Sequence, residues 1–421
     1  MKKSLVALAA LAFAGAATAQ SSVTLFGVVD TGISSYSSKT VNALGQTITT
    51  SRNAVSSSGY NSSRLGFRGA EDLGGGLSAS FWLEAGVATD TGIGSGTGGG
   101  LIFNRRSTVS LSGSVGEIRL GRDYTPTFYN DTIFDPFGTN GVGTNLISTA
   151  NGFSSNGALT NGFTANSTYP RTTNSIGYFL PPNLGGVYGQ LMYSLNEQTS
   201  YDPASLTPPT AAAVAAKPSL ANTADNARAG RYVGGRLGYT TPTGAFDIAL
   251  AYSEATIASN YFLGTTTNLA TWNIGTSYDF GPVKLFGEYS NNKLQLTTTN
   301  PLVNPLGFRE PGANGWLLGV TVPVGAGLIR IAYSVVDYNN TTRTSQVVGA
   351  VDQPKSDKWA LGYVYNLSKR TALYATVARI NNKNGADLLL GGPDFYAATA
   401  ASGPLVPKCS TGYDLGIRHA F

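Results

Sequence analysis

The chain is poor in the residues on which many enzymes and metal sites depend. Its 421 residues include one cysteine, Cys409, and one histidine, His419. A lone cysteine permits no intramolecular disulfide and no cysteine-based metal site, and a lone histidine permits no two-histidine zinc site. A Ser-His-Asp triad would need His419, and no phosphate-binding loop or nucleophile elbow is present. We therefore expect no enzyme activity, no cofactor and no bound metal.

The N-terminal segment has the pattern of a secretory signal peptide. Lys2 and Lys3 precede an apolar run from Leu5 to Ala14, and Ala17-Thr18-Ala19 provides small residues for cleavage. The run is shorter than the ~20 residues that a transmembrane helix needs. The sequence thus predicts a removed signal peptide at 1–19 and an exported chain at 20–421.

Charge is scarce, because only 12% of the residues are Asp, Glu, Lys or Arg. Without Lys2 and Lys3 the formal charge falls from +5 to +3, which is too small an excess to indicate a nucleic-acid partner. Apolar residues make up 42% but form no helix-length run beyond the signal. Any membrane-spanning part must therefore consist of strands with alternating faces.

Such alternation recurs along the chain in runs of about ten residues. It is clear at 23–30, 77–85, 246–252, 283–289 and 329–335, where apolar side chains alternate with polar or small ones. Charged side chains occur on the polar face, which fixes the register of each strand because a charge facing lipid is costly. One face of each strand therefore suits hydrocarbon and the other suits water.

The final strand follows the same pattern and ends on an aromatic residue. Tyr413, Leu415, Ile417, His419 and Phe421 share one face. A strand edge cannot be left unpaired in lipid, so we expect this strand to pair with the first one. We count about sixteen alternating runs, joined by short turns at one end and long polar loops at the other. The predicted fold is an all-β, 16-stranded antiparallel transmembrane β-barrel.

One connection, residues 123–170, is unusually long and carries three acids, Asp123, Asp131 and Asp135, but no Lys or Arg. It forms either an external flap or a loop folded back into the lumen. Its apolar and aromatic residues favour the second, because an external flap needs no apolar anchor: Tyr129, Ile133, Phe134 and Phe137. We therefore expect an inward-folded third loop.

Arginines on neighbouring strands share the inward register. Arg64, Arg68, Arg106 and Arg119 should form a basic strip on one wall, with the acids of the long loop facing it. Opposed charges across a narrow aqueous gap would order water and select polar solutes. The strip predicts a modest anion preference, moderated by inward-pointing acids and by screening: Asp30, Glu84 and Glu117.

Several segments resemble the general diffusion porins of the neisserial and burkholderial type. They are Ser22 to Asp30, Ser63 to Gly74, Asn104 to Leu111, Gly116 to Arg122 and Gly416 to Phe421. The resemblance implies a 16-stranded barrel that assembles as a homotrimer in the outer membrane of a Gram-negative bacterium, among lipid and lipopolysaccharide. It also implies that the third loop is the constriction.

Two details of this resemblance concern single motifs. Asp135-Pro136-Phe137-Gly138 stands where similar members carry a Pro-Glu-Phe-Gly-like element, so Phe-Gly is kept while the acid and the proline are exchanged. The terminal Phe421 looks like the signal read by the barrel-assembly machinery.

We conclude from the sequence that the chain forms a water-filled channel for passive diffusion of small hydrophilic solutes and inorganic ions. A solute-specific channel is the alternative, although no row of aromatic residues is evident along the inner wall. An adhesin is a third possibility. Aromatic residues near strand ends are expected in membrane-interface girdles: Tyr232, Trp272, Trp316 and Trp359.

Overall fold

The computed structural model describes residues 22–41, 44–94, 97–151, 168–197, 228–260, 265–298, 310–339, 353–390, 399–400, 403–404 and 406–421. The predicted signal peptide, 1–19, lies outside these residues. The strands are β1 (Ser22–Val41), β2 (Thr47–Ser57), β3 (Arg64–Gly74), β4 (Leu77–Ala88), β5 (Ile93–Gly94), β6 (Arg106–Gly113), β7 (Gly116–Tyr124), β8 (Arg171–Phe179), β9 (Val187–Ser194), β10 (Tyr232–Thr240), β11 (Phe246–Asn260), β12 (Thr265–Asp279), β13 (Lys284–Thr298), β14 (Gly312–Val324), β15 (Gly327–Asn339), β16 (Lys355–Asn366), β17 (Thr371–Lys383), β18 (Thr399–Ala400), β19 (Gly403–Pro404) and β20 (Val406–Ala420). The helical elements are η1 (Thr97–Gly99), α2 (Pro126–Ile133), η2 (Gly141–Gly143) and α3 (Leu146–Ala150).

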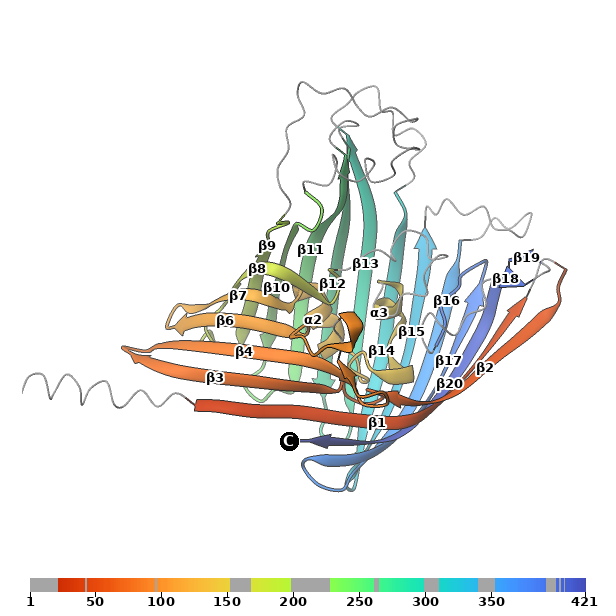
Figure 1. Cartoon of the computed structure of the whole chain (residues 1–421), viewed down its shortest axis with the longest axis horizontal. Helices are drawn as coiled ribbons and strands as arrows, with labels where there is room; N and C mark the ends of the chain where they lie inside the picture. The colour runs from red at the N-terminus through yellow and green to blue at the C-terminus, as the bar shows by residue number, and fades with distance from the viewer. Residues whose placement is uncertain are drawn as a thin grey trace, which may run out of the picture.

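The strands form a closed antiparallel barrel (Figure 1). Each wall strand pairs with its neighbour in the chain, and β20 pairs with β1 from Val28↔Ala420 to Val41↔Val406. The predicted pairing of last and first strands is confirmed. Closure leaves the two terminal strands of the wall without a free edge, which a barrel in lipid requires.

The wall contains sixteen strands, as the sequence predicts. The sheet comprises eighteen described strands, but β5 is a two-residue extension beside β4. In addition, β2 and β3 pair with successive parts of β1, the first with residues 31–41 and the second with residues 22–28. They therefore act as one wall strand, interrupted at residues 58–63.

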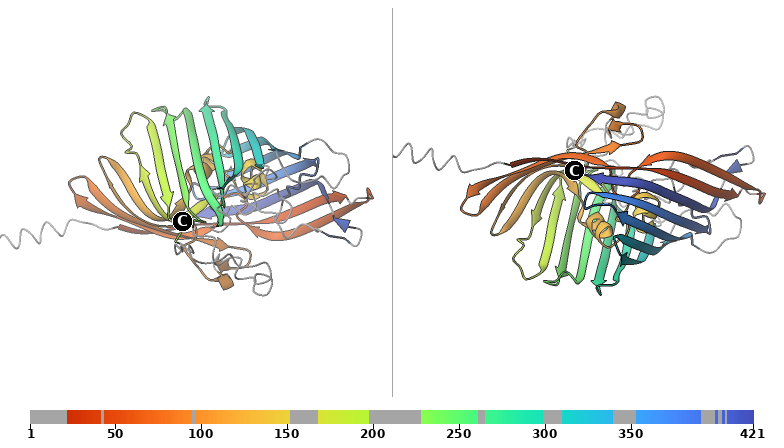
Figure 2. Two further views of the ribbon diagram at one scale, coloured as in Figure 1. Left: turned by 90° about the horizontal axis from the view of Figure 1, so that it is seen from above. Right: turned by 90° about the horizontal axis from the view of Figure 1, so that it is seen from below.

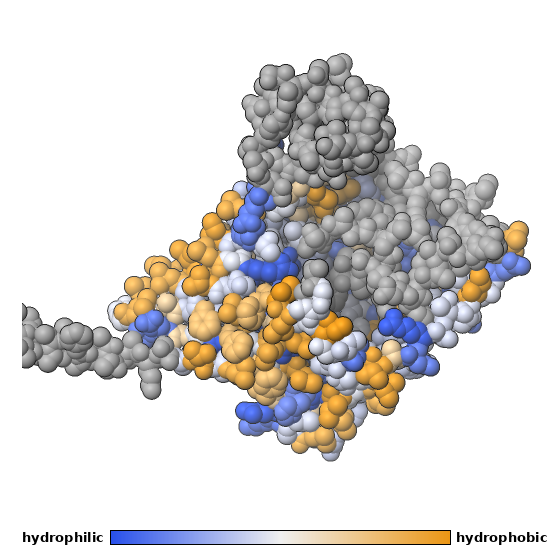
Figure 3. Space-filling model, in the orientation of Figure 1, coloured by the Kyte–Doolittle hydropathy of each residue, from blue (hydrophilic) through white to orange (hydrophobic). Residues whose placement is uncertain are grey.

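The two faces of the wall differ in polarity. Polar and charged side chains are buried on one face, including Asp30, Arg236, Ser334 and Asp414. Large apolar side chains are exposed on the other face of the same strands (Figure 3). They include Leu25, Ile33, Val109, Ile118, Leu191, Leu237, Leu250, Ile274, Leu318, Ile331, Leu361, Leu373 and Leu415. This arrangement, apolar outside and polar inside, is that of a membrane-spanning barrel.

Short turns join β3 to β4, β6 to β7, β14 to β15 and β16 to β17. The C-terminus lies at the same end of the barrel, because the Ala420 backbone N–H donates to the carbonyl of Arg370, 2.8 Å away, in the turn before β17. Among the described residues, no helix is long and apolar enough to cross a membrane.

The long connection between β7 and β8 holds α2, η2 and α3. Helix α2 contacts β9 to β12, α3 contacts β14 to β16, and η2 contacts β16, β17 and β20. The views from above and below show both helices within the ring of strands (Figure 2). Of the long loop, residues 123–170, the structure describes 123–151 and 168–170.

Candidate functional site

The predicted basic strip lies on the polar face of β3, β6 and β7, where three of its four arginines lie over aromatic rings. The guanidinium carbons of Arg68 and Arg106 lie 5.2 and 4.6 Å from the ring centroid of Trp82. The guanidinium carbon of Arg119 lies 4.0 Å from the centroid of Phe179. Such cation–π contacts hold these three guanidinium groups close to the rings of the wall.

Carboxylates on the same wall pair with these arginines. Arg119 Nη1 lies 2.6 Å from Asp123 Oδ2, and Arg119 Nη2 lies 2.9 Å from Glu117 Oε1. Arg106 Nε is 3.7 Å from Asp123 Oδ2. The prediction that Asp123 faces the strip from across the lumen is therefore wrong. Asp123 is the second-last residue of β7, four residues after Arg119, and it neutralises the strip from the same wall.

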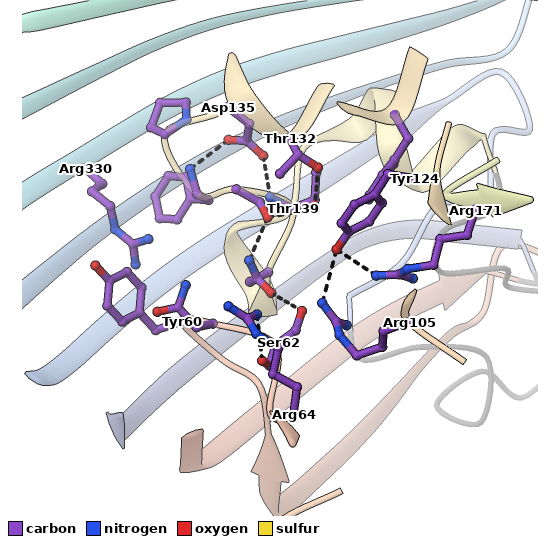
Figure 4. A pocket seen from close by; sticks show the side chains of 16 residues that line it. Tyr60, Ser62, Arg64, Arg105, Tyr124, Thr132, Asp135, Thr139, Arg171 and Arg330 are labelled. Atoms are coloured by element: carbon purple, nitrogen blue, oxygen red, sulfur yellow. Dashed lines mark hydrogen bonds between the residues drawn. The ribbon is translucent and has the colours of Figure 1, made fainter. Parts of the chain in front are cut away.

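A second group of arginines surrounds a cavity of about 380 Å³ (Figure 4). We call it the arginine cavity; its charged lining residues are Arg64, Arg105, Arg171, Arg330 and Asp135. Of these, only Arg64 belongs to the predicted strip. Arg105 precedes β6 and Arg171 begins β8, so neither lies within a clear alternating run, and sequence reasoning missed both.

Tyr124 joins two of these arginines. Its hydroxyl oxygen accepts from Arg105 Nη2 at 3.1 Å and from Arg171 Nη2 at 2.7 Å. Arg105 Nε also pairs with Glu84 Oε1 at 2.6 Å, and Arg64 Nε lies 3.8 Å from the same oxygen. One carboxylate thus serves two arginines, and Arg171 has no carboxylate partner among the described residues.

Arg330 approaches the arginine cavity from the opposite wall. Its guanidinium carbon is 4.6 Å from the ring centroids of both Tyr60 and Phe137. The side chain is 3% exposed, and its Nε and Nη2 atoms have no hydrogen-bond partner among the described residues. The sequence places Arg330 on the inner face of its strand, but its place in the lining of the same cavity as Arg64 and Arg105 is a property of the closed barrel.

The long loop is hydrogen-bonded to the polar face of the wall. From α2, Asn130 Nδ2 donates to the carbonyl of Ala249 at 3.0 Å, and Asn273 Nδ2 of β12 donates to the carbonyl of Thr127 at 2.9 Å. Further along the loop, the Val142 N–H donates to Asp414 Oδ2 at 2.7 Å. The loop is therefore fixed to widely separated strands.

Two further contacts fix the segment of the loop at residues 144–146. The Leu146 N–H donates to Ser334 Oγ at 3.1 Å, and Lys358 Nζ donates to the carbonyl of Thr144. Lys358 is 2% exposed, so this carbonyl is the contact that compensates part of the cost of burying its charge.

Glycines on the inner face provide space for the apolar side chains of the loop. A Cβ atom added to Gly275 of β12 would overlap the ring of Phe134, and one added to Gly319 of β14 would overlap Pro136. Phe134 is fully buried and Phe137 is 2% exposed, as expected of apolar anchors. Tyr129, by contrast, is 39% exposed and faces the lumen beside Arg236.

The other two predicted acids of the loop stabilise the loop itself. Asp135 accepts from the N–H groups of Phe137 and Thr139 at 2.8 and 3.1 Å, and from Asn145 Nδ2 at 3.0 Å. Asp131 accepts from Asn145 Nδ2 at 2.7 Å and from the Tyr169 hydroxyl. The expectation that Asp131 faces the basic strip is wrong, because this carboxylate is buried inside the loop. Asp135 is also buried and hydrogen-bonded within the loop, but it borders the arginine cavity together with Arg64 of the strip.

Burial changes the ionisation of these groups. It raises the pKa of Asp135 from an ordinary 3.8 to about 6, although the backbone N–H donors act in the opposite direction. Burial also raises the pKa of Asp131. At neutral pH, Asp135 carries its charge at the expense of loop stability.

The terminal strand has the predicted outer face. Tyr413, Leu415, Ile417 and Phe421 are 55, 62, 48 and 42% exposed, and His419 shares this face with its Nδ1 2.9 Å from the Thr371 hydroxyl oxygen. The backbone N–H and carbonyl of Phe421 pair with Gly27, each at 3.1 Å.

Aromatic residues depart from the sequence interpretation in two ways. Trp272 and Trp359 are exposed on the outer face, but Tyr232 is 2% exposed and packs against Met192, so its predicted place in a girdle is wrong. A row of aromatic residues also does line the inner wall. Its members are Phe26, Trp82, Tyr124, Phe179 and Tyr188.

Within the described residues, no group of three or more His, Cys, Asp or Glu side chains is placed to hold a metal ion. The arginine cavity offers guanidinium donors to an anion.

Comparison with known proteins agrees with this geometry. The family described as Gram-negative porin matches residues 4–385. Outer membrane porin protein 32 of Delftia acidovorans is 37% identical over the whole of both chains, and an outer membrane porin protein of Bordetella pertussis is 32% identical, over 89% of this chain and 93% of its own. The solved structure of an anion-selective porin from Comamonas acidovorans has a TM-score of 0.69 and 34% identity, over 96% of this chain and all of that one.

Proposed function

We propose that this chain, which belongs to the Gram-negative porin family and resides in the outer membrane, forms a water-filled channel with a weak preference for anions. Small hydrophilic solutes and inorganic ions would cross it by passive diffusion. The single observation that carries the anion preference is the arginine cavity, in which four guanidinium groups and one buried carboxyl group line about 380 Å³.

The excess of positive charge is local. Arg171 and Arg330 have no ion-pair partner among the described residues, whereas Arg64 and Arg105 share Glu84. A permeating anion at this point exchanges part of its hydration for guanidinium donors, while a cation meets like charge. The preference stays weak, because Asp123 and Glu117 neutralise the neighbouring strip and salt screens charges beyond ~8 Å.

The long loop, residues 123–170, is the constriction in this proposal. Its support is the set of hydrogen bonds to Ala249, Ser334 and Asp414, which hold α2, η2 and α3 against the polar face. Phe137 and Asp135 border the arginine cavity from the loop side. The loop would thus narrow the lumen at the height of the guanidinium groups.

Other parts of the proposal rest on the family. We propose a homotrimer with removal of residues 1–19 on export. The exposed outer face would contact lipid and lipopolysaccharide, and the terminal residues would be read by the barrel-assembly machinery: Tyr413, Leu415, Ile417, His419 and Phe421.

The test is the zero-current potential of the reconstituted protein in a KCl gradient. The unaltered protein should give an anion-favouring sign, and the double variant Arg171→Gln, Arg330→Gln should shift it towards cations. Lys369→Gln, Arg370→Gln is the matched control, because it removes two charges from an exposed short turn. A cation-favouring potential in the unaltered protein, or equal shifts in both double variants, would contradict the proposed selectivity.

A further inference from the structure

A second cavity, of about 520 Å³, lies between helix α2 and the wall formed by β4 to β11. We call it the aromatic cavity. Its ring-bearing lining residues are Trp82, Tyr124, Tyr129, Phe179 and Tyr188. Phe179 ends β8, and Tyr188 lies at the second position of β9, so this cavity is nearer the short-turn end of the barrel.

The two cavities differ in charge. Three guanidinium groups and three carboxylates line the aromatic cavity: Arg106, Arg119, Arg236, Glu84, Asp123 and Asp247. Their formal charges cancel, whereas four arginines and one acid line the arginine cavity. An anion therefore gains less electrostatic stabilisation in the aromatic cavity than in the arginine cavity. A neutral solute has no charge of its own to remove from water, so it does not incur that desolvation cost.

The charged groups are held in fixed orientations by one another. The Tyr188 hydroxyl oxygen accepts from Arg236 Nη2 at 3.1 Å, and this hydroxyl donates to Asp247 Oδ1. The Trp82 indole N–H donates to Glu84 Oε2 at 3.1 Å. Donors and acceptors thus alternate along the wall. The rings between them each have a guanidinium group over them and are otherwise partly exposed, Tyr129 most of all.

This combination matches one class of solute. A sugar hydroxyl both donates and accepts, so it can bridge a guanidinium group and a carboxylate, while the C–H face of a pyranose ring packs on an aromatic ring. We propose that the aromatic cavity is a binding site for a neutral saccharide of one or two rings. The proposal rests on the proposed channel only in that the solute reaches the site through the lumen.

The volume supports this size of ligand, since about 520 Å³ is within the range of small-molecule sites. An aromatic carboxylate would place a net negative charge beside Glu84, Asp123 and Asp247. The balanced charges therefore favour the neutral polyol over the charged aromatic acid.

Maltose is the probe, and binding is measured in two ways. In the first, the variant Trp272→Phe, Trp316→Phe, Trp359→Phe keeps only Trp82, and its emission should change saturably with maltose. Trp82→Phe, which keeps the other three tryptophans, should show no change. The chain has four tryptophans, so the two variants together account for all of its tryptophan emission.

In the second, maltose should reduce the KCl conductance of the unaltered protein saturably. Phe179→Leu should raise the half-blocking concentration about fivefold, the scale of a lost ring contact. Phe246→Leu is the matched control, because Phe246 precedes Asp247 on β11 and points to the outer face; its half-blocking concentration should be unchanged.

The outcomes separate the two proposals. A protein that conducts KCl but shows no maltose block and no change in Trp82 emission would overturn the saccharide site and leave the channel intact. Block by sodium benzoate without block by maltose would also overturn it. A protein without conductance would overturn the channel, while a saturable response of Trp82 would still support the site.

Discussion

Replacing Gly275 by valine should release the long loop from the wall. Gly275 lies on the inner face of β12, and any Cβ there would overlap the ring of Phe134, which has no exposed surface. The ring cannot turn aside within a fully packed site, so Phe134 must leave its contact. The substitution therefore tests whether this contact holds the loop.

The expected magnitude follows from the burial of Phe134. Fully burying a phenylalanine side chain stabilises a structure by about 1.5–3 kcal/mol. Because each 1.4 kcal/mol is a factor of ten, the ratio of released to docked loop should rise about 10- to 100-fold. In planar bilayers, Gly275→Val should show larger or strongly fluctuating single-channel conductance.

Gly287→Val is the matched control. Gly287 lies on the outer face of the adjacent strand β13, in register with the exposed Leu285 and Tyr289. A Cβ there would make only ordinary contacts, 3.7 Å to Thr276 and 3.9 Å to Leu318. This variant should conduct like the unaltered protein. The reasoning is refuted if Gly275→Val assembles normally and its conductance matches that of Gly287→Val.

Two further predictions concern pH and the lipid-facing surface. The pKa of Asp135 in the docked loop, about 6, exceeds its ordinary 3.8, so docking takes up a proton; the loop should be most stably docked below about pH 4 and lose that stability as pH rises to about 6. Channel noise should increase over this interval, and Asp135→Asn should reduce the dependence; an unchanged dependence would exclude Asp135 as its source. Leu415→Arg, on the outer face, should lower the free energy of unfolding in lipid vesicles by about 2–4 kcal/mol, whereas Leu367→Arg in an exposed turn should cost about 0–1 kcal/mol. Equal losses for both leucine variants in urea titrations would argue against lipid contact at Leu415.

The barrel could be predicted from the sequence because its rule is local. Apolar and polar side chains must alternate along a strand that has lipid on one face and water on the other. The neighbours Asp414 and Leu415 are an example, since the first is buried on the inner face and the second is exposed on the outer face. The pairing of β20 with β1 followed from the need to leave no edge in lipid.

The site could be predicted only in part, because its contacts join distant residues. Phe134 and Gly275 are far apart in the chain, and although the alternation places Gly275 on the inner face, nothing local marks it as the glycine that a loop side chain meets. Arg105 and Arg171 lie where strands begin, so no alternating pattern marks them as inward-facing. Their convergence on the Tyr124 hydroxyl exists only once β7 and β8 are paired.

The acids of the long loop show why counting charged residues in the sequence does not predict the direction of the electric field across the lumen. Asp131 and Asp135 were expected to face the arginines, but their hydrogen bonds are with groups of the loop, and only Asp135 borders the arginine cavity. The carboxylates that do pair with arginines lie on the same wall as the strip: Glu84, Glu117 and Asp123. Opposite charges therefore alternate along the wall, and the unbalanced positive charge is concentrated where Arg171 and Arg330 meet across the arginine cavity. Under the proposed function, ion selection at that one place, with charge balance beside it, would let an anion preference coexist with passage of neutral solutes.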